Sequence, residues 1–293
     1  MLSALVSGLV VGGIYGLLAL GIVLVYKGAR VLNFAEAELG TFALYLAWWG
    51  VDQRGWPWLV AALFALVAVG LVSLAFERLV IARMVDASRL SVAVATLGLM
   101  LLLLAIEFKV WGSGPKFLAA PFGGNAVSLA GVFVTPVQVF AVLAAAAIGL
   151  GLTTFLRRTD FGLGVLAAAQ DATAIRLMGV PFAKVSAFTW VAAGVLGGVA
   201  ALLIEPSIGA FAPGFTLPLF VPALAAALIG GLENLSGAFL GGIAVGLIDQ
   251  LVRWQFVSST VPGVQALVIF GLILVVLLLR PGGLLPAPRG RHA

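Results

Sequence analysis

Long apolar runs recur along the whole of this sequence, and they constrain its fold more than any other feature. Apolar residues make up 63% of the 293 positions and charged residues only 9%, against the ~25% that is typical of soluble domains. A soluble fold of this length has too little polar surface to cover so much apolar material, so its solvent must be lipid. The sequence therefore predicts an all-α fold, a polytopic bundle of transmembrane helices.

The apolar runs predict about eight to ten membrane segments, because a spanning helix needs ~20 residues. They lie near residues 4–25, 33–50, 57–77, 91–110, 136–156, 185–204, 218–232, 238–252 and 263–279. The runs 218–232 and 238–252 are too short for a ~30 Å hydrocarbon core, since about fifteen residues rise only ~22 Å. Two short tilted helices and a re-entrant hairpin both fit them. We expect residues 1–293 to form a single transmembrane domain, with some segments broken or re-entrant.

Basic residues predict how the chain is oriented. Twelve of the sixteen Lys and Arg residues fall in the connections 26–32, 78–90 and 157–184 and in the tail 280–293. Cytoplasmic connections of membrane proteins carry an excess of Lys and Arg. The N-terminus is therefore expected outside and the C-terminus in the cytoplasm.

The residue inventory excludes several kinds of chemistry. The chain has no cysteine and one histidine, His292, beside its C-terminus, so disulfides, thiolate catalysis, histidine metal clusters and a Ser-His-Asp triad are not expected. We expect no catalytic residue and no metal site. The basic residues are scattered through connections, a pattern that sets membrane orientation and does not indicate nucleic-acid binding.

The first polar interruption of an apolar run covers residues 33–40. Asn33 and Glu36 fall on one face of a helix that starts here, and Glu38 points roughly opposite. Acidic residues inside a membrane are costly and usually face a cavity or a partner. Two interpretations stay open: the side chains line a translocation pathway, or Asn33 caps a helix whose dipole the acids complement.

The second interruption, residues 230–237, places Glu233, Asn234 and Ser236 between two apolar runs. Non-helical backbone at membrane depth is tolerated where it is buried in protein or lines a wet cavity. We therefore add these three residues to the candidate pathway. Farther along, Asp249 precedes Arg253 by one helical turn, and we interpret the two as a structural ion pair near the outer surface.

The connection 157–184 is too polar for a membrane span and too regular for a slack linker. It is rich in alanine, has a polar centre, and stops at Gly179-Val180-Pro181, which predicts short helices that end there. This segment resembles the cytoplasmic coupling loop of bacterial ATP-binding-cassette (ABC) importer permeases of the branched-chain amino acid class. The matching positions are Gly162, Ala168, Asp171, Leu177, Gly179 and Val180. Leu163 and Leu166 stand where arginines are common in that family.

The likeness extends over almost the whole chain. Residues 12–21 look like the first-helix signature of that family, and residues 230–242 are similar to its late glycine signature. Residues 33–38 are similar to its Asn-Phe-Ala-x-Gly-Glu motif, although Ala37 replaces the glycine. Residues 280–284 resemble its terminal Arg-Pro-x-Gly-Leu.

The resemblance implies a permease subunit in a bacterial cytoplasmic (inner) membrane. Such a subunit moves a small amino acid such as leucine, isoleucine or valine by alternating access. The implied partners are a second related permease (in a heterodimer or a homodimer), two ATPase subunits and an extracellular solute-binding protein. Coupling to the ATPase would involve Gly162, Ala168, Gln170, Asp171, Arg176, Leu177 and Gly179.

Nucleotide chemistry is expected on the partner subunits. The chain has no Gly-Lys dipeptide and so lacks a Walker A phosphate loop. No cofactor is expected on this chain, and ATP and Mg are expected on the partners. The alternatives are an ion-coupled secondary transporter of a small polar solute, a related ABC permease for urea or short amides, and an intramembrane enzyme. The missing cysteine and the terminal position of the histidine weaken the enzyme alternative.

Overall fold

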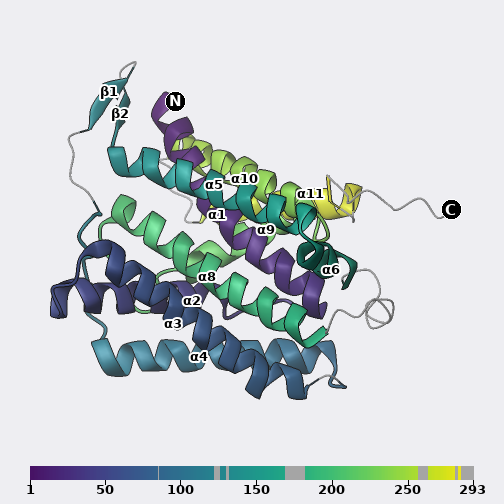
Figure 1. The fold of residues 1–293 in the computed structure, drawn as a ribbon. Helices are drawn as coiled ribbons and strands as arrows, with labels where there is room; N and C mark the ends of the chain where they lie inside the picture. Colours follow the sequence, from purple (N-terminus) through teal and green to yellow (C-terminus); the bar gives the residue numbers. More distant parts are fainter. Residues whose placement is uncertain are drawn as a thin grey trace.

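The computed structural model describes residues 1–84, 86–121, 126–129, 132–168, 182–256, 263–280 and 283–284. Within them the chain is a bundle of helices with one small hairpin at its edge (Figure 1). The helices are α1 (Leu2–Ala29), α2 (Glu36–Trp48), α3 (Trp58–Leu79), α4 (Arg89–Trp111), α5 (Pro136–Arg158), α6 (Asp160–Ala168), α8 (Phe182–Ile208), α9 (Leu217–Gly230), α10 (Leu235–Gln255) and α11 (Val264–Leu279). A π-helical turn, η1 (Trp49–Gln53), continues α2, and a 3-10 turn, η2 (Ile81–Arg83), follows α3. The antiparallel strands β1 (Val127–Leu129) and β2 (Val132–Val134) form the hairpin.

Each apolar run of the sequence corresponds to a helix, which confirms the prediction of a polytopic helical bundle. Among the described residues, six helices are long and apolar enough to cross a membrane: α1, α3 with η2, α4, α5, α8 and α10. The apolar helices α9 and α11 are shorter. The expectation that 238–252 is a short segment is wrong, because α10 extends past the apolar run at both ends to reach 21 residues. Its N-terminal end is capped by Asn234, whose side chain accepts a hydrogen bond from the Gly237 N–H.

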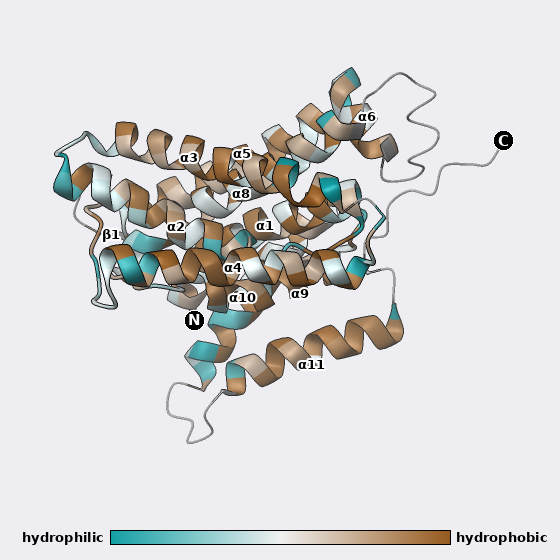
Figure 2. Ribbon diagram, turned by 90° about the horizontal axis from the view of Figure 1, so that it is seen from below, coloured by the Kyte–Doolittle hydropathy of each residue, from teal (hydrophilic) through white to brown (hydrophobic). Residues whose placement is uncertain are grey.

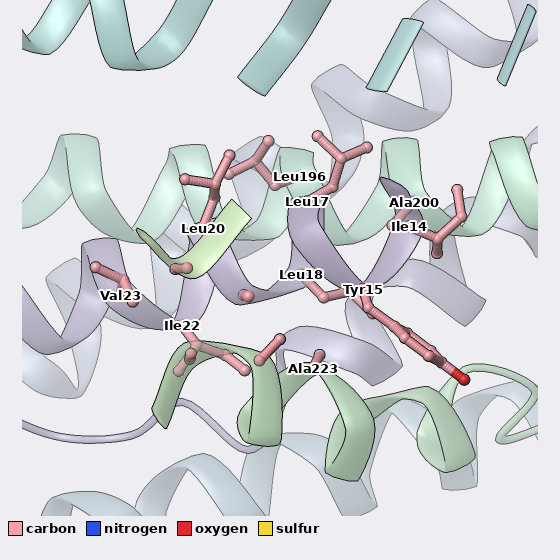
Figure 3. Packing of buried hydrophobic residues seen from close by; sticks show 14 of the residues in the cluster. Ile14, Tyr15, Leu17, Leu18, Leu20, Ile22, Val23, Leu196, Ala200 and Ala223 are labelled. Carbon is pink, nitrogen blue, oxygen red and sulfur yellow. The ribbon is translucent and has the colours of Figure 1, made fainter. Parts of the chain in front are cut away.

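Helix α1 forms the centre of the bundle. It contacts α5, α8, α9 and α10, and 89% of its most apolar 18-residue stretch is buried in the protein. Leu17 and Ile22 of α1 pack in one cluster with Leu196 of α8 and Ala223 of α9 (Figure 3). Gly8 and Gly12 of α1 lie against the backbone of α10, and small residues of this kind allow helices to pack closely in lipid.

A second group of helices packs on the far side of α8. Helices α2, α3 and α4 share a hydrophobic cluster that also includes Ala201 and Leu202 of α8. The most apolar stretches of α3, α4 and α5 are only 33%, 28% and 22% buried. Hydrophobic residues predominate in these helices (Figure 2), and many of them are exposed, such as Leu63, Leu101 and Leu143. Apolar faces of this extent are stable only against lipid or another apolar partner.

The basic connections meet at one end of the bundle. The end of α1, the connection between α3 and α4, and the start of α8 line a common cavity there. Arg30 pairs with Glu233 at this end, and an Arg157 N–H donates to Ser236 Oγ at 3.1 Å. Helix α6 lies at the same end, opposite the β hairpin (Figure 1). A single shared end is what the orientation rule for basic residues requires.

Candidate functional site

Two helices begin inside the bundle instead of at its ends. The Glu36 side chain, at the start of α2, packs against the Gly21 backbone, which precedes the end of α1 at Ala29 by about two turns. Helix α9 has 14 residues, which rise about 21 Å, whereas the 28 residues of α1 rise about 42 Å. Since the turn that follows α9 lies beside Arg30, α9 begins about halfway along α1. Helices interrupted in this way are typical of the binding regions of transporters.

Side chains satisfy the non-helical backbone that leads into α2. Thr96 Oγ1, from α4, accepts a hydrogen bond from the Phe34 N–H at 3.2 Å. Asn33 Oδ1 accepts one from the Ala35 N–H at 3.1 Å, in the manner of a turn-forming Asx residue. The prediction that Asn33 shares a helical face with Glu36 is wrong, because α2 begins only at Glu36. Asn33 shapes the turn that precedes the helix.

The stretch 209–216, which leads into α9, is supported in the same way. The Gly214 N–H donates to Glu107 Oε2 at 3.3 Å, and the Thr216 N–H donates to Thr41 Oγ1 at 3.1 Å. The Thr216 hydroxyl donates to the Ala37 carbonyl and lies 2.6 Å from the Thr41 hydroxyl. The start of α9 is therefore joined to the first turns of α2, and this junction is buried in protein as non-helical backbone at membrane depth must be.

Three carboxyl groups surround the junction. Glu36, Glu38 and Glu107 are all 0% exposed. Neither carboxylate oxygen of Glu36 has a hydrogen-bond donor among the described residues. Glu107 Oε2 accepts a hydrogen bond from the Gly214 N–H, whereas both carboxylate oxygens of Glu38 lack a hydrogen-bond partner among the described residues. The Glu36 carboxylate lies against Gly21 of α1, whereas the Glu38 carboxyl lies near Glu107 of α4.

The second predicted group lies elsewhere, in the turn between α9 and α10. The Glu233 carboxylate is 2.7 Å from an Arg30 guanidinium nitrogen, with the two side chains 54% and 39% exposed. This hydrogen bond raises the pKa of Arg30. Asn234 caps α10, and Ser236 accepts a hydrogen bond from Arg157. The structure therefore groups Glu233 and Ser236 with the basic end of the bundle and not with Glu36 and Glu38.

The first part of the coupling segment is a tight corner between α5 and α6. The Gly162 N–H donates to Thr159 Oγ1 at 3.0 Å, and a Cβ at Gly162 would lie 2.5 Å from the Leu156 Cα. Helix α6 therefore packs closely on the end of α5 and ends at Ala168. The other predicted coupling residues lie outside the described residues; they are Gln170, Asp171, Arg176, Leu177 and Gly179.

Sequence reasoning missed several residues that build the junction. Glu107 is an acid inside the run 91–110, and the rule that flagged Glu36 and Glu38 also applies to it. Thr41, Thr96 and Thr216 carry no such signal, because a threonine in an apolar helix usually bonds its own backbone. Within the part of the chain that is described, no group of three or more histidine or acidic side chains is arranged to hold a metal ion.

In the part of the chain that the structure describes, six helices long and apolar enough to span a membrane, two helices that begin inside the bundle and a buried polar junction are typical of a polytopic membrane transport protein. Residues 4–278 match the family described as branched-chain amino acid transport system / permease component. This match covers most of the chain, so the chain belongs to that family. The match also confirms the resemblance seen in the motifs.

Curated relatives align over nearly the same length. The chain is 29% identical to the high-affinity branched-chain amino acid transport system permease protein BraD of Pseudomonas aeruginosa, over 98% of this chain and 96% of that protein. It is 27% identical to the LivH permease protein of the corresponding Escherichia coli K12 system, with the same two coverages. A probable LivH permease of Methanocaldococcus jannaschii is 29% identical over 83% of this chain and 78% of its own length.

Proposed function

We propose that this chain is the membrane-spanning permease subunit of an ABC importer that carries leucine, isoleucine or valine across a bacterial cytoplasmic membrane. The observation that supports this most strongly is the family match over residues 4–278, together with relatives named for branched-chain amino acid transport over 98% of this chain. An ion-coupled secondary transporter is not favoured by this family.

ATP hydrolysis falls to partner subunits in this proposal. Two ATPase subunits hold ATP and Mg, a second related permease completes the membrane core, and an extracellular solute-binding protein delivers the amino acid.

An affinity-tagged form of this chain should co-purify with the ATPase and the second permease when their genes are co-expressed. A tagged chain that purifies alone and transports amino acid without ATP contradicts the proposal.

The translocation route is proposed to pass near the junction of α2 and α9. Asn33, Glu36 and Glu38 flank the start of α2, and the turn that contains Glu233, Asn234 and Ser236 forms the inner mouth of the route. The junction joins two helices that both begin inside the bundle, so it can shift without unfolding either helix. Alternating access then follows as this region changes its position between two states.

The corner at Gly162 provides the first coupling prediction. A methyl group at this position would clash with the Leu156 backbone, so Gly162→Ala should displace α6 while leaving the spans intact. We expect loaded binding protein to stimulate the ATPase activity of the assembled variant complex about fivefold less than that of the wild-type complex, or weaker still. Gly151→Ala, on the same helix α5, is the matched control, because nothing lies within 4 Å of a Cβ there. Full stimulation in the Gly162 variant would remove α6 from the coupling route.

The orientation can be tested with single cysteines, because the chain has none of its own. Ala87 and Ser113 are both exposed, in the connections that follow α3 and α4. An impermeant thiol reagent added to intact cells should label Ser113→Cys and should leave Ala87→Cys unmodified until the cells are opened. The reverse labelling pattern would place the N-terminus in the cytoplasm and α6 outside the cell.

A further inference from the structure

A cavity of about 260 Å³ lies at the end of α1 that is opposite Arg30. Helices α1, α5, α8, α9 and α10 all contribute to its wall. Its charged groups are Asp249 and Arg253 of α10, and Tyr15 of α1 also lines it. Aliphatic wall positions include Val10, Ile204 and Leu219. The orientation proposed above places this cavity on the outer side of the membrane.

Asp249 is held rigidly in the cavity wall. It is 0% exposed, and its Oδ2 accepts a hydrogen bond from the Tyr15 hydroxyl at 3.1 Å. Gln265 of α11 donates to the other oxygen, Oδ1, and the neighbouring Gln250 donates to Oδ2 at 3.4 Å. These donors are neutral and come from three helices, so they fix the position of the carboxylate without compensating its charge.

Arg253 supplies the opposite charge at the rim of the cavity. Its Nε is 3.6 Å from Asp249 Oδ2, and its side chain is 57% exposed. The predicted ion pair is therefore confirmed, but its separation is longer than a hydrogen bond. A guanidinium has five N–H donors and suits a carboxylate in a bidentate arrangement. A positive and a negative group thus stand next to each other beside an aliphatic wall.

We propose that this cavity binds the zwitterionic backbone of an aliphatic amino acid. The α-ammonium donates to Asp249, the α-carboxylate accepts from Arg253, and the aliphatic side chain contacts Val10, Ile204 and Leu219. An amino acid carries its ammonium and carboxylate groups on the same carbon atom, so the two charges lie close together, as the neighbouring Asp249 and Arg253 require. A wall that fixes both charges rejects a molecule that lacks either one, because a buried polar group is then left unpaired. The inference rests on the proposed function and adds to it a place of binding.

The test uses the assembled transporter in lipid nanodiscs and a diazirine analogue of leucine that keeps both backbone charges. After irradiation, mass spectrometry should find adducts on the peptides that contain Val10, Ile204 or Leu219, and excess leucine should suppress them. Leucinamide lacks the carboxylate and 4-methylpentanoate lacks the ammonium, so each should compete at least about tenfold more weakly. Equal competition by all three molecules would overturn the proposal.

Variants of the exposed arginine give a second readout. Arg253→Gln should lower the adduct yield on these peptides at least about tenfold, and Arg253→Lys should restore part of it. Arg54→Gln is the matched control, since Arg54 is an exposed arginine outside the cavity, beside the Trp49 ring. Unchanged labelling in Arg253→Gln, or adducts only on other peptides, would leave Asp249 and Arg253 as a structural ion pair.

Leucine uptake by the same preparations separates this inference from the proposed function. If the wild-type transporter takes up leucine but is not labelled at this cavity, the binding site is wrong and the importer assignment stands. If the cavity is labelled but ATP drives no uptake, the importer assignment fails instead.

Discussion

Replacing Gly246 with leucine should prevent the bundle from folding, because no side chain fits between α1 and α10. A Cβ at Gly246 would overlap the Gly12 backbone, and one at Gly242 would overlap the Gly16 backbone. Overlap with backbone cannot be relieved by a change of rotamer, so the two helices would have to separate. Because α10 is one of the main neighbours of the central helix α1, separation exposes the core. Small residues allow such close approach of helices in lipid.

The expected loss in the free energy of unfolding is more than about 4 kcal/mol, the range seen for severe overpacking. The measurement is the yield of monodisperse protein in detergent, followed by thermal unfolding. Gly98→Leu is the matched control, since Gly98 of α4 has nothing within 4 Å of a Cβ and lies on an exposed face. A Gly246 variant that is as stable as the Gly98 variant would show that the packing of α1 on α10 is not close.

Glu107→Leu should give the second large effect, through the loss of polar contacts inside the bundle. Glu107 accepts a hydrogen bond from the Gly214 N–H, and its carboxyl lies near that of Glu38. Leucine would leave the partly buried Gly214 N–H without its partner and would place an apolar side chain beside the fully buried Glu38 carboxyl. We expect a loss of about 3 kcal/mol or more in the free energy of unfolding.

Glu107→Gln should cost about 1 kcal/mol, because the amide retains a hydrogen-bonding group at the same place. Glu233→Gln should change stability by less than about 1 kcal/mol, since its partner Arg30 is exposed and such pairs contribute little. Chemical denaturation in mild detergent compares the three variants. Equal stability of Glu107→Leu and Glu233→Gln would mean that Glu107 does not support the start of α9.

The membrane bundle was predictable from the sequence, whereas the interrupted helices were predictable only in part. Apolar runs report helices directly, because every residue of a spanning helix must suit lipid or a tightly packed core. The short run 218–232 correctly indicated a short helix, now seen as α9. The place where α9 begins depends on the contact between Thr41 and Thr216, which are 175 residues apart. No local pattern encodes a contact of that kind.

The same reasoning applies to the acidic residues. The burial of Glu36 and Glu38 follows from their position in an apolar run, and the structure confirms it. Spacing alone predicted the ion pair of Asp249 with Arg253. The hydrogen bond from Tyr15 to Asp249 joins residues 234 positions apart, so no local pattern indicated that this carboxylate is buried beside a cavity.

The most direct test of the account is leucine uptake into proteoliposomes that contain this chain with the second permease and the ATPase subunits. With leucine-loaded binding protein outside and ATP inside, the account predicts accumulation of leucine that stops when ATP is replaced by a non-hydrolysable analogue. Liposomes with this chain alone should show no uptake under any ion gradient. Accumulation by this chain alone, driven by a proton or sodium gradient and indifferent to ATP, would contradict the account.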